Sequence, residues 1–82
     1  MENIKKWLVE WFVENGDVTE ETLLENLDAN YFNAGFLDSF TFISLIGDIE
    51  DEYQIEFDNE QFLNRDFATI NGLAAIIADL ME

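Results

Sequence analysis

Two adjacent polar residues, Asp38 and Ser39, stand directly before a stretch whose apolar residues recur at helical spacing. At a helix start, the Asp38 carboxylate is a good N-cap, and the Ser39 hydroxyl lies beside backbone N–H groups without a partner in the helix. An anionic group on that hydroxyl would be stabilised by those N–H groups and by the positive end of the helix dipole. Taken alone, however, the pair is most simply explained as ordinary helix caps.

The chain offers no group able to activate this hydroxyl. It contains no His and no Cys, which excludes an imidazole base, a thiolate nucleophile, disulfides and a Cys/His zinc site. Asp38 is a weak base at the usual carboxyl pKa. No pair of carboxylates is marked out as an acid/base site. We therefore expect that the chain is not an enzyme and that a separate enzyme would have to modify Ser39.

Three stretches have apolar residues at the spacing of an amphipathic helix. The first ends near Asn15 and Gly16 and presents Ile4, Trp7, Leu8, Trp11 and Phe12 on one face. The second runs from Asp38 and Ser39 to about Tyr53, with Phe42, Leu45, Ile46, Ile49 and Tyr53 on its inner face. The third follows a capping Thr69 and places Ile70, Leu73, Ala74 and Ile77 toward the core.

The connections are less regular. Between Gly16 and Asp38, Thr19 can cap a short turn, and further on Asp58 can cap another short turn that contains Phe62. A long ordered connection is uncommon and often functional. The sequence predicts an all-α fold, a small bundle of three main helices plus one short helix, with a long loop between the first two main helices.

Size and charge restrict the choice of partners. The 82 residues, 49% of them hydrophobic, suffice for one small core, so we expect a single domain over residues 1–82 and a monomer. The net charge of -16 repels nucleic acid and anionic lipid and attracts basic protein surfaces.

No stretch is apolar and long enough to span a membrane, and Glu10 and Glu14 interrupt any hydrophobic signal region. These features predict a cytoplasmic protein without nucleic-acid binding or membrane insertion.

The stretch Gly35-Phe36-Leu37-Asp38-Ser39-Phe40 resembles the signature of the acyl and peptidyl carrier protein family, in which a Gly precedes an Asp-Ser pair and an apolar residue follows. Residues 45–57 resemble the family's acidic second helix and the chain that leaves it. Residues 64–70 resemble the start of its last helix. The resemblance spans essentially the whole chain and implies an acyl carrier protein-like fold. It also implies 4′-phosphopantetheine on Ser39, with Asp38 contributing to recognition by the modifying transferase.

The resemblance also implies the partners. They are a phosphopantetheinyl transferase that uses coenzyme A and a divalent metal, a ligase that loads acyl or aminoacyl groups, and a downstream synthase or transferase. The arm ends in a thiol that carries its cargo as a thioester, which would give a chain without cysteine a role in thiol chemistry. No metal site is expected in the chain itself.

The chain departs from the fatty-acid-synthesis type of carrier. Phe40 replaces the usual Leu, and Thr41 and Ser44 stand where acidic residues are common. The motif from Gly35 to Phe40 is more similar to that of free-standing carriers. These are either the D-alanyl type or the carriers of specialised biosynthesis, and the sequence does not decide between the two types. Aromatic crowding would favour a short or aminoacyl cargo.

A second face of the helix that begins at Ser39 is predicted to dock partner enzymes, because it mixes apolar and acidic side chains. Its residues are Phe40, Ile43, Ser44, Gly47, Glu50 and Asp51. Alternatively, Phe40 and Ile43 tuck under the long loop. Gly47 costs about 1 kcal/mol relative to Ala inside a helix, which suggests close approach by a neighbour or by the tethered arm.

Two other functions compete with the carrier interpretation. An acidic helical module that binds a basic protein and is never modified would need only the charge. A calcium-binding protein is the weaker rival, because the acidic residues lack the spaced ligands and central glycine of an EF-hand loop. These acids are Asp48, Glu50, Asp51 and Glu52.

Overall fold

Helices account for most of residues 2–81, the part of the chain that the computed structural model describes. The helices are α1 (Glu2–Asn15), α2 (Glu20–Leu24), α3 (Ser39–Tyr53), α4 (Asn59–Leu63) and α5 (Ile70–Leu80), with a turn of 3₁₀ helix, η1 (Arg65–Ala68), before α5. The all-α prediction is confirmed. The three main helices form where the apolar spacing predicted them. Short helices, α2 and α4, form at both predicted capped turns, so the structure has two short α-helices where one was expected. The sequence did not indicate η1.

Local side-chain caps explain where most of these helices begin. The Thr19 side chain accepts from the Thr22 backbone N–H, and the Thr69 side chain accepts from the Gly72 N–H at 2.9 Å. At α4, Asp58 and Gln61 form a reciprocal capping box. Because each cap joins residues only two or three positions apart, these helix starts can be recognised from sequence alone.

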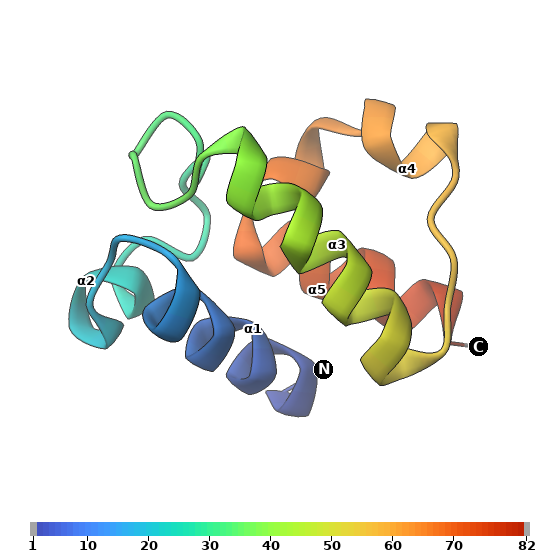
Figure 1. Ribbon diagram of the computed structural model, residues 1–82, viewed down its shortest axis with the longest axis horizontal. Helices are drawn as coiled ribbons and strands as arrows, with labels where there is room; N and C mark the ends of the chain where they lie inside the picture. Colours follow the sequence, from blue (N-terminus) through green and yellow to red (C-terminus); the bar gives the residue numbers. More distant parts are fainter. Residues whose placement is uncertain (1, 82) are drawn as a thin grey trace.

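The three long helices meet around one core, with α3 crossing in front of α5 and α1 beside them (Figure 1). Helix α2 lies next to α1, and α4 lies at the opposite side of the molecule (Figure 1). The buried core residues are Ile4, Leu8, Val9, Trp11, Phe12, Leu23, Tyr31, Phe36, Leu37, Leu45, Ile49, Phe67, Ile70, Leu73, Ala74 and Ile77. Of these, α3 contributes only Leu45 and Ile49, while Phe42, Ile46 and Tyr53 are half-buried at its edge. Much of α3 therefore faces solvent.

The long loop between α1 and α3 is tied to the last part of the chain. The Tyr31 N–H donates to the Ala68 carbonyl at 3.0 Å, and the Tyr31 hydroxyl donates to the Phe67 carbonyl. Further back in the loop, the Asn71 N–H donates to the Leu27 carbonyl at 3.1 Å. Burial raises the pKa of the Tyr31 hydroxyl, which therefore stays a donor at any ordinary pH. These bonds order the segment that leads to the Asp-Ser pair.

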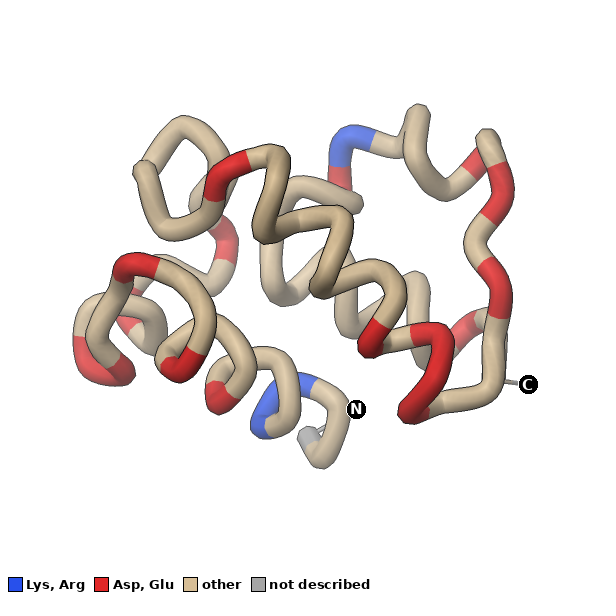
Figure 2. The backbone as a smooth tube through the Cα atoms, viewed as in Figure 1, with Lys and Arg blue, Asp and Glu red and all other residues tan. Residues whose placement is uncertain are grey.

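Acidic residues are spread over most of the molecule, whereas the basic ones are confined to the start of α1 and to η1 (Figure 2). These cations are Lys5, Lys6 and Arg65. Within residues 2–81, no helix has both the length and the apolar character required to cross a bilayer.

Candidate functional site

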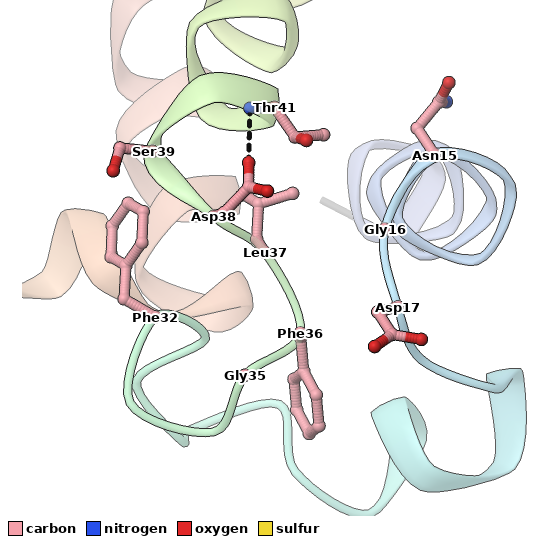
Figure 3. A pocket seen from close by; sticks show the side chains of 10 residues that line it. All are labelled: Asn15, Gly16, Asp17, Phe32, Gly35, Phe36, Leu37, Asp38, Ser39 and Thr41. Atoms are coloured by element: carbon pink, nitrogen blue, oxygen red, sulfur yellow. Dashed lines mark hydrogen bonds between the residues drawn. The ribbon is translucent and has the colours of Figure 1, made fainter.

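Asp38 is the N-cap of α3, as predicted. Its extended backbone conformation brings the carboxylate to the Thr41 N–H, which donates to Oδ1 at 2.7 Å (Figure 3). Hydrogen bonds from Thr41, first from the backbone N–H and then from the side chain, hold the pKa of Asp38 below its usual value. A carboxylate with a lowered pKa is a still weaker base, so Asp38 is a cap rather than a proton acceptor for Ser39.

Ser39 is the first residue of α3, and its side chain is exposed. It points away from the Asp38 carboxylate (Figure 3), and its hydroxyl takes part in none of the side-chain hydrogen bonds found among residues 2–81. The N–H groups of a first helical turn have no partner inside the helix. The hydroxyl is thus accessible and lies where a helix best tolerates an added negative charge.

Two glycines shape the approach to this serine. Gly35 has a positive φ of 78°, a conformation that residues with a side chain rarely adopt. Gly16, directly after α1, lies so close to the loop that a Cβ atom there would come within 2.6 Å of the Phe36 carbonyl oxygen. The next residue, Asp17, donates its N–H to that same oxygen at 3.0 Å. The end of α1 therefore holds the loop that presents Asp38 and Ser39.

A cleft of about 540 Å³ opens beside Ser39, between the end of α1 and the loop before α3 (Figure 3). Its lining residues are Asn15, Gly16, Asp17, Phe32, Gly35, Phe36, Leu37, Asp38, Ser39 and Thr41. Because the Ser39 hydroxyl is exposed at a helix start, a phosphodiester added there would not have to displace a side chain from the core. Ser39 is the residue that would hold such a group.

The predicted docking face of α3 is mostly open. Phe40 is 84% exposed and Ile43 is 73% exposed, so the alternative in which both tuck under the loop is not the arrangement observed. Ser44, Gly47 and Asp51 are also exposed.

Two members of this face, Glu50 and Gly47, have further structural features. Glu50 is half-buried and accepts a hydrogen bond from the Phe57 N–H at 3.0 Å, so it holds the chain that leaves α3. At Gly47, an added Cβ atom would meet nothing within 4 Å, so no neighbour within the fold explains the glycine.

The acidic residues of α3 do not gather into a metal site. Among residues 2–81, no group of three or more Asp, Glu, His or Cys side chains is arranged to hold a metal ion. Asp48, one of the acids considered for calcium, instead accepts the indole N–H of Trp11 at 2.7 Å.

Known proteins resemble this chain over most of its length. Residues 14–77 match the family described as "phosphopantetheine attachment site". The D-alanyl carrier protein 2 of Lactiplantibacillus plantarum is 31% identical over 64 residues, which are 78% of this chain and 80% of that protein. No solved structure matches the chain significantly.

Proposed function

Because this chain belongs to the phosphopantetheine-attachment family of carrier proteins, we propose that Ser39 is the residue that carries its arm. The arm itself, covalently attached 4′-phosphopantetheine, is the cofactor of this family. The observation that supports Ser39 most directly is its exposed position as the first residue of α3, beside an open cleft. Ser44, the other serine of the chain, lies more than one helical turn inside α3, away from unpaired N–H groups.

The modification is proposed to occur in trans. A phosphopantetheinyl transferase would join the Ser39 Oγ to the phosphorus of the phosphopantetheine in coenzyme A. The phosphoanhydride bond breaks, adenosine 3′,5′-bisphosphate leaves, and a base of the transferase accepts the hydroxyl proton. The chain's own contribution is positional, because the lowered pKa of Asp38 leaves no base beside the hydroxyl.

The thiol of the arm then supplies the chemistry of the carrier. A ligase loads it with an acyl or aminoacyl group as a thioester, and a downstream synthase or transferase takes that group away. An aminoacyl cargo is the proposal for this chain, supported by the similarity to a protein named as a D-alanyl carrier. The proposed carrier works as a monomeric single domain in the cytoplasm.

The proposed docking surface is the exposed face of α3 next to Ser39. Phe40 and Ile43 supply apolar contact area, while Asp51 and the general negative charge attract basic partners. Replacing either apolar residue by Ser should raise the KM of the transferase for this protein and leave kcat unchanged. Leu63→Ser is the matched control, because Leu63 on α4 is also apolar and 86% exposed. An equal rise in KM for the control would contradict the assignment of the surface.

Intact mass tests the attachment itself. After incubation with coenzyme A and a broad-specificity transferase, the chain should gain the mass of one phosphopantetheine. Ser39→Ala should gain none, and Ser44→Ala should be modified like the unaltered chain. If the wild-type chain gains no mass, the alternative function, an unmodified acidic interaction module, is favoured. If the Ser39→Ala variant gains the mass, the attachment residue is not Ser39.

A further inference from the structure

A row of aromatic rings begins directly beneath the attachment site. Phe42 lies one helical turn after Ser39, on the inner side of α3. Its ring meets that of Phe32, from the long loop, edge to face with the centroids 5.0 Å apart. On its other side it meets Phe67 of η1, also edge to face, at 5.8 Å. Loop, α3 and η1 are thus joined by rings at the end of α3 that bears Ser39.

The middle of the row is buried, and its far end returns to the surface at Phe62. Phe67 also packs against Phe57 at 5.2 Å and Phe62 at 5.1 Å, and Tyr31 packs against Phe32 at 5.0 Å. Phe67 and Tyr31 are buried, and the Tyr31 hydroxyl bonds to the Phe67 carbonyl. Aromatic pairs at these distances are favourable, and close-packed interiors resist opening. The rings therefore fill the interior between Ser39 and the core.

Phe32 is the ring of the row that lies at the cleft beside Ser39. It is 38% exposed and lines the same cleft as Ser39 (Figure 3). The rest of that cleft is mixed, because Phe36 and Leu37 line it together with Asn15, Asp17, Asp38 and Thr41. A group on the arm consequently meets an open, partly polar cleft on one side of Ser39 and packed rings on the other. An alkyl chain in the open cleft stays in contact with water, and the packed rings leave no space for it.

We propose that Phe32 and Phe42 close the core to the group carried on the arm, and so restrict this carrier to short acyl groups such as aminoacyl groups. The inference deepens the proposed function and rests on attachment at Ser39. A short cargo with a charged ammonium group loses nothing by staying in water or in the acidic cleft. A long alkyl chain would remain exposed unless the two rings moved apart.

The test uses the arm's thiol, which is the only thiol because the chain has no cysteine. The phosphopantetheine-bearing protein is labelled with N-methylmaleimide or N-octylmaleimide, and the melting temperatures of the two adducts are compared. In the unaltered chain they should coincide. In Phe32→Ala, which opens a gap at the end of the row nearest Ser39, the octyl adduct should melt about 5 °C above the methyl adduct, because a ligand that binds the folded state stabilises it. Phe62→Ala, at the far end of the row, is the control and should show no such difference.

Two results would overturn the inference. One is an octyl adduct that stabilises the unaltered chain, since the core would then already admit the alkyl group. The other is that the octyl and methyl adducts melt at the same temperature in both Phe32→Ala and the milder Phe42→Leu. In that case these two rings would not be what closes the core to the carried group. Failure of the proposed attachment is distinguishable, because no maleimide adduct would form and intact mass would reveal this before melting is measured.

Discussion

The indole N–H of Trp11 donates to the carboxylate of Asp48 across 2.7 Å and so joins α1 to the middle of α3. Trp11 is buried, whereas Asp48 lies on the exposed side of its helix. A buried indole N–H needs an acceptor, and a charged acceptor makes the stronger bond. One acid of the acidic helix thus holds α3, with Ser39 at its start, against α1.

Removing this acceptor should destabilise the fold. Asp48→Ala is expected to lower the free energy of unfolding by about 1–2 kcal/mol, because it leaves the Trp11 N–H unpaired. Urea unfolding measures the change. Asp51→Ala is the control on the same helix and should leave stability unchanged or slightly raised, since it removes one charge from a chain of net charge -16. Equal losses in the two variants would show that the hydrogen bond is not the cause.

Two glycines should respond to alanine in opposite directions. Gly47→Ala should raise the free energy of unfolding by about 0.5–1 kcal/mol, because alanine is the better helix former and its Cβ would meet no atom within 4 Å. Gly72→Ala should lower it, because a Cβ there would collide with the backbone of Asp66. Thermal melting of both variants checks the pair.

The Gly47→Ala variant also tests whether partner enzymes dock on α3. If Gly47→Ala is more stable yet is a poorer substrate of the transferase, the glycine serves close approach by a partner. Unchanged transferase kinetics would mean that partners do not need the missing side chain.

Asp38 should make the stability of the chain depend on acidic pH. Its pKa is lowered in the folded state from the usual 3.8, chiefly by the hydrogen bonds from Thr41. The resulting stabilisation is fully present above that usual value and is lost as the pH falls through the lower folded value. Asp38→Asn keeps a capping oxygen without the titration. In urea unfolding, wild-type stability relative to this variant should therefore stay constant at higher pH and fall only once the pH drops below about 4. Curves that stay parallel down to the lowest accessible pH would refute the linkage.

Added salt should stabilise the protein by screening its negative charge. We expect the melting temperature to rise with NaCl and with millimolar Mg²⁺ or Ca²⁺, because repulsion among nineteen acidic residues is reduced. No cluster of possible metal ligands occurs among residues 2–81. The divalent ions should therefore act without a defined stoichiometry. A saturable, tight transition in calorimetric titration would contradict diffuse association.

The sequence was sufficient to predict the three main helices, the caps at Thr19, Asp38, Asp58 and Thr69, and the Asp-Ser pair at a helix start. It could do so because amphipathic spacing and N-capping depend on residues a few positions apart. The family resemblance came from the motif around Ser39 and from residues 45–57 and 64–70. The exposed side of α3 followed from its apolar spacing.

The tertiary structure decided which polar and aromatic residues serve the fold. Tyr31 lies in a loop without periodicity, and only its contact with Phe67 shows why it is buried. In the sequence, nothing distinguishes Asp48 and Glu50 from Asp51. In the structure, Asp48 accepts a hydrogen bond from Trp11 and Glu50 accepts one from the Phe57 backbone, whereas Asp51 is exposed on the surface. The rings of Phe32 and Phe42 meet from separate segments beside Ser39. Such contacts join residues that are distant along the chain, so they depend on how the helices pack and not on the pattern within any one of them.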